Sequence, residues 1–260
     1  MCGFVGILDK TSKKEKKQNI KLMADKIIHR GPDSDGYYVD DNVALGFRRL
    51  SIIDLEGGSQ PLYNEKKDVV LVFNGEIYNF HELQKELSDY DFISTCDTEV
   101  IIAAYLKWGI GCVNKLQGMF AIALFDRQTD TLYLVRDRVG KKPLYYHRQE
   151  EGIVFASELK PIMEAPGFEG RINEEIVGQY LFQLYINAPN SIFKDVYKVQ
   201  PGEILEYCKG NITTRKYWDV ATVYQNKRKE MITDYETCKD MLKSALLEAT
   251  RKRMIADVPL

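Results

Sequence analysis

The chain begins with MCGFVGILDK (residues 1–10), where an apolar run of strand length starts directly after the first methionine. Chain ends are usually polar and frayed, so this beginning predicts a buried strand that starts at residue 2. Gly3 and Gly6 on that strand would let other backbone or a substrate approach closely. The stretch therefore places a thiol, that of Cys2, at the end of a core strand.

Cys2 is a candidate nucleophile, because a small side chain at position 2 permits removal of Met1 and leaves a free α-amine on the cysteine. The pKa of an α-amine is about 7.7–8.0 and that of a thiol about 8.5, so the pair is poised for proton transfer near neutral pH. The amine can then act as general base for the sulfur of its own residue. The alternative is that Cys2 is a small buried hydrophobe, as most free cysteines are, and position alone favours that alternative.

The composition is that of an ordinary soluble globular protein, with 260 residues, 45% hydrophobic and 28% charged. The net charge of −2 gives no support for a nucleic-acid partner or an anionic membrane surface. The longest apolar stretches, such as VVLVF, have the length of a strand and are too short to span a membrane. We therefore expect a protein without nucleic-acid or membrane partners.

Cysteine usage indicates a reducing compartment. The five cysteines are odd in number and form no C-x-x-C pair, which argues against a disulfide framework and a structural zinc site. The three histidines form no H-x-x-x-H pattern. We therefore expect a cytoplasmic protein without a metal ion in this part of the chain.

Hairpins dominate the pattern along the chain. They are predicted over 36–53, 118–140 and 142–159, and the strand in DVVLVFNGEIYNF (68–80) runs into Asn74-Gly75, a strong turn signal. Short strands are expected over 191–218. Because hairpins join the strands, the sheets should be mainly antiparallel with helices covering them, which is an α+β layered domain.

Helices are expected where apolar residues recur at helical spacing, as at Ile20, Met23 and Ile27. The basic run Lys13 to Lys17 is interpreted as a solvated loop, and 221–230 as a polar linker. We expect one domain over 1–218 and a linker plus the first helix of another domain over 219–260. The expected helices cover 18–29, 80–89, 98–108, 159–164, 173–185 and 233–253.

Several polar residues could hold an amino acid next to a nucleophile. Asn74 and Gly75 could stabilise the oxyanion formed when a thiolate attacks an amide. Arg49 can bind a carboxylate with its forked donors, and Glu76 and Asp97 can receive an ammonium group. Each has a simpler alternative: Asn-Gly is a common turn, the charges are common on surfaces, and Asp97 could be the N-cap of the helix that follows.

Ten stretches, taken together and in this order, make the chain resemble a class II glutamine amidotransferase domain of asparagine synthetases of the B type. RDRVGKKPLYY with FASELK points to this family rather than to the glutaminases of amidophosphoribosyltransferase or glucosamine-phosphate synthase. The stretches are spread over residues 1–205. They are MCGFVGI, HRGPDSDG, RRLSIID, SQPL, FNGEIYN, CDTEV, GMFAIALFD, LVRDRVGKKPLYY, FASELK and QPGEI.

The resemblance implies an N-terminal-nucleophile hydrolase fold, a four-layer αββα sandwich of two antiparallel sheets. It also implies hydrolysis of L-glutamine to glutamate and ammonia through a γ-glutamyl thioester on Cys2. In the family's scheme Arg49 holds the α-carboxylate of glutamine, and Asn74 and Gly75 form the oxyanion hole. The remaining substrate-binding residues that the resemblance implies are Glu76 and Asp97 at the amino-acid end and the backbone of Leu50, Ser51, Ile52 and Ile53.

The motif from His29 to Asp33 lies near the site in this family, and we assign it no chemical step; Arg30 within it could equally be structural. Family members continue after DVPLG into an SGGLDS-type loop that binds ATP pyrophosphate, whereas this chain ends at RMIADVPL. We therefore expect a fragment that hydrolyses glutamine without a cofactor and makes no asparagine. Aspartate, ATP and Mg²⁺ are expected to serve only the full-length enzyme.

Three questions stay open at this stage. The domain could be a non-catalytic glutamine sensor or a docking module instead of an enzyme. The acceptor of the ammonia could be a carboxylic acid other than aspartate, as in some relatives. A homodimer is the default expectation for its assembly.

Overall fold

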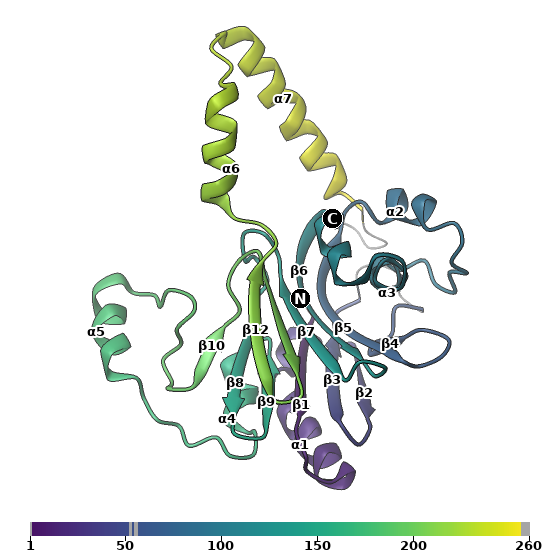
Figure 1. The fold of residues 1–260 in the computed structure, drawn as a ribbon, viewed down its shortest axis with the longest axis vertical. Helices are drawn as coiled ribbons and strands as arrows, with labels where there is room; N and C mark the ends of the chain where they lie inside the picture. The colour runs from purple at the N-terminus through teal and green to yellow at the C-terminus, as the bar shows by residue number, and fades with distance from the viewer. Residues whose placement is uncertain (1, 52–53, 55–56, 256–260) are drawn as a thin grey trace.

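The computed structural model describes residues 2–51, 54 and 57–255. Its centre is a pair of six-stranded sheets in which each recorded strand pairing is antiparallel, with helices on the two outer faces (Figure 1). This is the four-layer αββα arrangement that the resemblance implies, and the predicted fold class is confirmed.

Each sheet follows the hairpins of the sequence. The first sheet has the order β10 (Val196–Lys198), β8 (Tyr145–Gln149), β9 (Gly152–Ala156), β1 (Gly3–Leu8), β3 (Val43–Arg49) and β2 (Ser34–Val39). The second has the order β12 (Asn211–Lys216), β11 (Glu203–Cys208), β7 (Thr131–Arg136), β6 (Gly118–Asp126), β5 (Val69–Ile77) and β4 (Leu62–Tyr63). The three predicted hairpins are confirmed as β2–β3, β6–β7 and β8–β9.

The layers are held together by strands that are apolar on both faces. Along β1, Phe4 points into the core between the sheets, whereas Val5 and Ile7 point into the core under the outer helices. Along β5, Val72 faces the inter-sheet core and Phe73 faces the opposite helical layer. This alternation has the period of two that a pleated strand imposes, and it brings the start of β1 opposite β5.

The helices cover the outer faces of the two sheets or lie outside the sandwich. Covering the first sheet are α1 (Lys13–Asp25), the turn η1 (Ile28–Arg30) and α4 (Leu159–Met163), and covering the second are α2 (Phe80–Glu86), α3 (Asp97–Trp108) and the turn η2 (Gly109–Asn114). The others are α5 (Glu174–Gln183), α6 (Val220–Lys227), η3 (Arg228–Glu230) and α7 (Tyr235–Lys252). In the described part of the chain, no helix combines the length and the apolar character that crossing a membrane requires.

The prediction of a solvated loop at Lys13 to Lys17 was wrong. These residues form the first turns of α1, which starts at a capping box made by Ser12 and Glu15. Lys16 is 0% exposed, and its Nζ donates to the carbonyl oxygens of Asp9 (2.8 Å), Thr11 (2.7 Å) and Asp41 (3.0 Å). The run looks basic and exposed in sequence, but one of its lysines bonds to three carbonyl groups from two separate loops.

The prediction of a turn at Asn74-Gly75 was also wrong, because β5 continues through both residues to Ile77. Asn74 pairs with Ala121 and Gly75 with Phe120 of β6. A Cβ on Gly75 would lie 2.2 Å from the carbonyl oxygen of Met119. Glycine is therefore required here by the close approach of the neighbouring strand rather than by a turn.

The segment after residue 218 leaves the sandwich. The predicted polar linker instead forms α6, capped by Asp219, and α6 and α7 make a helical arm that projects from the sheets (Figure 1). Apolar residues on α7, such as Met241 and Leu246, are more than half exposed. The end of α7 returns to the domain, where the Arg253 guanidinium lies over the Tyr78 ring at 4.7 Å.

Candidate functional site

A cavity of about 260 Å³ lies between the start of β1 in one sheet and β5 in the other. Cys2 lies at its inner wall, and Asn74, Gly75 and Glu76 enter from β5. Arg49, at the end of β3, and Asp97, at the start of α3, also line it. The cavity therefore joins a thiol to groups of both charges.

The sulfur of Cys2 is held by the backbone of Leu50. The Leu50 N–H donates to Sγ at 3.3 Å, and the thiol donates to the Leu50 carbonyl at 3.4 Å. Burial raises the pKa of the Cys2 thiol, while the Leu50 N–H, Arg49 and Lys142 act in the opposite direction. The surroundings therefore include a donor and two cations that favour the thiolate, which is the reactive form.

The backbone of Cys2 is fixed from the motif HRGPDSDG. Arg30 Nε donates to the Cys2 carbonyl at 3.0 Å, and Arg30 Nη1 pairs with Glu158 at 3.0 Å. Asp33 accepts the N–H of Ser51 at 2.8 Å. This motif therefore positions the nucleophile and the loop after β3, which supports a structural role for Arg30.

Arg49 reaches the cavity beneath a tight loop. Its guanidinium donates to the carbonyl of Asp54, and a Cβ on Gly58 would lie 2.5 Å from Nη2, so this position leaves room for the arginine. The carboxylate of Asp54 accepts the N–H of Gly57 at 2.7 Å and that of Thr95 at 3.1 Å. The loop is thereby tied to the segment that leads into α3.

Asn74 carries an unsatisfied donor into the site. Its side chain is 1% exposed, and its amide nitrogen has no hydrogen-bond partner among the described residues. Leaving a buried donor unpaired costs about 1–3 kcal/mol, so such a group usually has a functional reason. An oxygen placed in the cavity would satisfy it.

Gly75 presents its backbone to the same edge. In an antiparallel ladder, alternate residues direct their N–H and C=O groups to opposite sides. Val69 bonds to Asn64 and Ile77 donates to Asp97, both on the side of β5 away from β6. Gly75 has the same parity as Val69 and Ile77, so its N–H points to this side, where β4 has already ended.

Two carboxylates lie at the other end of the cavity. Asp97 accepts the N–H of Ile77 at 2.8 Å, and burial raises its pKa to about 7. Burial also raises the pKa of Glu76, against the opposing charges of Lys142 and Arg253. Asp97 is not the N-cap of α3, as one interpretation had it: that position is Cys96, and the Asp97 side chain holds β5 instead.

The structure thus brings seven of the ten predicted residues to one cavity. Ser51 is not among the lining residues, and Ile52 and Ile53 lie outside the described part of the chain. The seven that line it are Cys2, Arg49, Leu50, Asn74, Gly75, Glu76 and Asp97.

Sequence reasoning missed Lys142 and Gln60, two of the buried polar residues of the lining. Lys142 is 5% exposed, and its backbone is pinned by Asp137 (2.9 Å to the N–H) and by Arg136 (2.9 Å to the carbonyl). Gln60 lies on the β4 side. Lys142 belongs to the motif RDRVGKKPLYY and Gln60 to the motif SQPL. Their presence in these motifs was the only feature of the sequence used here that pointed to them. The remaining lining residues are Phe47, Gly58, Phe73, Cys96, Thr98 and Met119.

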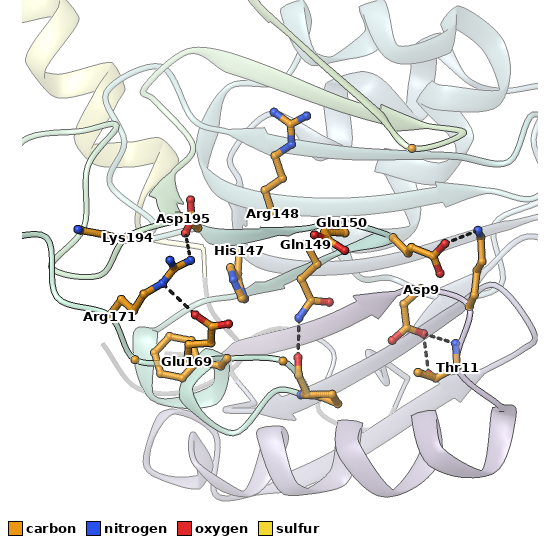
Figure 2. Close-up of a pocket in the computed structure, with 17 residues that line it drawn as sticks. Asp9, Thr11, His147, Arg148, Gln149, Glu150, Glu169, Arg171, Lys194 and Asp195 are labelled. Atoms are coloured by element: carbon orange, nitrogen blue, oxygen red, sulfur yellow. Dashed lines mark hydrogen bonds and ion pairs between the residues drawn. The ribbon is translucent and has the colours of Figure 1, made fainter.

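A larger hollow of about 950 Å³ lies beside the β8–β9 hairpin (Figure 2). Some of its charges are paired, with Arg171 at 2.9 Å from Glu169 and at 3.0 Å from Asp195. His147 Nδ1 is buried without a partner, but burial lowers the pKa of this imidazole, and its ring packs edge-on against Phe168. The described residues that line it include no cysteine and no serine.

A metal site is not apparent in the part of the chain that the structure describes. Within residues 2–51, 54 and 57–255, no three His, Cys, Asp or Glu side chains are grouped as metal ligands would be.

Known proteins resemble the chain in sequence and in fold. Asparagine synthetase [glutamine-hydrolyzing] 1 of Bacillus subtilis is 38% identical over 265 residues, covering 100% of this chain and 41% of that protein. Amidase chry2 of Gibberella zeae is 35% identical over 248 residues, covering 93% of this chain and 36% of that protein. The chain therefore spans well under half the length of these relatives.

The fold has a solved counterpart in the glutamine phosphoribosylpyrophosphate amidotransferase of B. subtilis. That structure has a TM-score of 0.60 and covers 83% of this chain and 49% of its own, at 20% sequence identity, so the likeness concerns the fold alone. Residues 1–218 match the family model described as the glutamine amidotransferase domain. Because that match spans the whole sandwich, the chain belongs to the glutamine amidotransferase domain family.

Proposed function

We propose that this domain hydrolyses L-glutamine to glutamate and ammonia, with Cys2 as the nucleophile. The observation that carries the proposal is one juxtaposition. The Cys2 sulfur, held at 3.3 Å by the Leu50 N–H, lines the same cavity as Asn74, whose buried amide nitrogen has no partner among the described residues. A nucleophile and an unused donor are what amide hydrolysis requires.

In the proposed mechanism, removal of Met1 frees the α-amine of Cys2, which takes the thiol proton. The thiolate attacks the side-chain amide carbon of glutamine (Cδ), and the oxyanion that forms is stabilised by Asn74 Nδ2 and the Gly75 N–H. The α-ammonium returns its proton to the leaving nitrogen, so ammonia departs and a γ-glutamyl thioester remains. Water, deprotonated by the same amine, attacks the thioester, releases glutamate and restores the thiol.

The charges of the cavity match the amino-acid end of glutamine. Arg49 offers forked donors to the α-carboxylate. The carboxylates of Asp97 and Glu76 receive the α-ammonium group. Lys142 adds a cation near Cys2 and Glu76: burial lowers the pKa of its ammonium group, and the charges of Glu76 and Cys2 oppose that shift. The hydrolysis needs no metal ion or cofactor.

We also propose a role within a longer protein. Ammonia from this site would amidate aspartate to asparagine in a synthetase domain that uses ATP and Mg²⁺, and residues 219–260 would be the linker and first helix of that domain. The exposed apolar residues of α7 support this, because a monomeric protein rarely leaves such a stripe uncovered. The fungal relative named an amidase keeps a second acceptor open. We place the protein in the cytoplasm, in keeping with its five free cysteines.

The decisive experiment compares thiols. Release of glutamate and ammonia from glutamine should be abolished by Cys2→Ala and unaffected by Cys238→Ala, which removes an exposed thiol on the helical arm. Intact-mass analysis after treatment with 6-diazo-5-oxo-norleucine should find one adduct, on a chain that lacks Met1. Ammonia release by Cys2→Ala at the parental rate would refute the mechanism. A parental protein without Met1 that neither turns over glutamine nor forms the adduct would favour a sensor or docking module.

A further inference from the structure

The side chain of Gln60 acts as a clamp on the strand that carries Asn74. Its Oε1 accepts the N–H of Phe73 at 2.6 Å, and its Nε2 donates to the carbonyl of the same residue at 3.1 Å. Gln60 is 9% exposed and Phe73 is 2% exposed, so both bonds are shielded from water. One amide therefore satisfies both backbone groups of the residue just before Asn74.

The register explains why a side chain is needed at this point. β4 pairs with β5 through Leu62–Leu71 and Tyr63–Val70, and the same register continued would place the backbone of residue 60 opposite Phe73. The recorded ladder ends at Leu62, and the Gln60 carbonyl oxygen lies instead beside Gly36 of β2, 1.9 Å from the position that a Cβ would take there. The primary amide of Gln60 supplies the donor and acceptor that a third residue of β4 would have offered.

The clamp also reaches the other end of the cavity. Gln60 Nε2 lies 3.4 Å from the hydroxyl of Thr98, the neighbour of Asp97 on α3. Every second residue of β5 directs its backbone groups to this edge, so Gly75 and Ile77 follow Phe73 there. The N–H of Ile77 donates to the Asp97 carboxylate. The unpaired edge at Gly75 is thus flanked by two residues whose backbones are hydrogen-bonded to side chains, Phe73 to Gln60 and Ile77 to Asp97.

We propose that Gln60 is a positioning residue for glutamine hydrolysis, which sets the oxyanion donors Asn74 and Gly75 by fixing the Phe73 backbone. This inference rests on the proposed function. Because both amide atoms of Gln60 are engaged by Phe73, the residue acts through the strand rather than on the substrate. A displacement of about 1 Å in a catalytic group can cost about 100-fold in rate, so a loosened strand should lower kcat more than it raises KM.

Three variants separate hydrogen bonding from packing. Gln60→Ala removes the amide and its volume, Gln60→Met keeps the volume without the bonds, and Gln60→Glu keeps an acceptor for the Phe73 N–H only. The matched control is Asn64→Ala. Asn64 is 6% exposed and clamps the other end of the same hairpin, where its Oδ1 accepts the N–H groups of Asp68 and Val69 at 3.1 Å each.

Steady-state kinetics with glutamine, normalised to the folded fraction from circular dichroism, gives the test. We expect kcat to fall about 10- to 100-fold in Gln60→Ala and Gln60→Met, less in Gln60→Glu, with KM changed less than about threefold. Asn64→Ala should lose comparable thermal stability and keep kcat. If Gln60→Ala does not fold, Gln60→Met and Gln60→Glu carry the comparison.

Two results would overturn the inference. Parental kcat in Gln60→Met would mean that the side chain only fills space. A raised KM at unchanged kcat would mean that Gln60 contacts the bound glutamine. A parental protein without Cys2-dependent hydrolysis would instead defeat the proposed function, so the two failures are distinguishable.

Discussion

Two hollows of this domain differ in the groups that line them. The larger, of about 950 Å³, is lined by many charged side chains, some of them paired, such as Arg171 with Glu169 and Asp195 (Figure 2). The smaller, of about 260 Å³, holds a thiol and the unpaired amide nitrogen of Asn74. Volume alone would point away from the cavity that holds the candidate nucleophile Cys2.

The difference follows from where each hollow lies. The larger is a surface depression of loops and strand ends, where water can solvate charges and ion pairs contribute little. The smaller lies where two sheets meet, so its groups are desolvated and their pKa values shift, as at Asp97. Shifted carboxylates beside a nucleophile are a mark of functional sites. The comparison predicts that substitutions in the small cavity change the rate of glutamine hydrolysis. Substitutions around the larger hollow should change the free energy of unfolding or have no measurable effect.

Replacement of the unpaired donor should give the largest effect. Asn74→Ala is expected to lower kcat for glutamine about 100- to 1,000-fold with a modest change in KM, because one oxyanion donor is lost. Arg171→Gln in the larger hollow is the control and should leave kcat unchanged. Its free energy of unfolding should change by less than about 1 kcal/mol, as for other exposed ion pairs. A comparable loss of kcat in both variants would break the distinction between the hollows.

The wall of the larger hollow offers a stability test. Lys16 lies under Asp9 and Thr11, which line that hollow, and it satisfies three carbonyl groups. Lys16→Met should lower the free energy of unfolding by about 2–3 kcal/mol, because the carbonyls lose their donor. Chemical denaturation gives the value, and kcat of the folded protein should not change.

The control for that test is Lys14→Met, which alters an exposed lysine of the same helix. Its effect on the free energy of unfolding should stay within about 0.5 kcal/mol. Equal denaturation midpoints for the two variants would show that Lys16 contributes no more to the free energy of unfolding than an exposed lysine does.

Much of the sandwich follows from local patterns in the sequence. The hairpins at 36–53, 118–140 and 142–159 were predictable because their turn residues interrupt apolar alternation within one stretch. The turn expected at Asn74-Gly75 failed because β6, more than forty residues away, pairs with β5 through that point. A local turn signal carries no information about such a distant partner strand. Here the pairing with β6 keeps Asn74-Gly75 extended in spite of the turn preference of this dipeptide.

The candidate site divides in the same way. Cys2, Arg49, Asn74 and Asp97 were found because their chemistry suits an amino acid and their motifs resemble a known family. Gln60 and Lys142 have roles that depend on a strand register and on a cavity, and neither can be read from neighbouring residues. The buried Lys16 was missed for the same reason, since its three carbonyl partners come from two separate loops.

The pH dependence of glutamine binding gives the smallest of the predicted effects and the finest test of the small cavity. Asp97 must be ionised to pair with the α-ammonium of glutamine, and its pKa is raised to about 7 by burial. Below that pH it gains a proton and loses the pairing, so the Kd should rise by up to about tenfold for each pH unit. Above pH 7 the Kd should level off. The raised pKa of Glu76 acts in the same direction at lower pH.

Binding has to be measured apart from catalysis, because the α-amine of Cys2 titrates in a nearby range. Calorimetric titration of the Cys2→Ala protein with glutamine measures binding alone, since this variant should bind glutamine without hydrolysing it. In the same background, Asp97→Asn should bind more weakly and show a much flatter profile between pH 5.5 and 8 (roughly the range around the Asp97 pKa). A profile as steep in Asp97→Asn as in its parent would place the titrating group elsewhere, with Glu76 the nearest candidate. The contrast with the larger hollow would then rest on Asn74 and Cys2 alone.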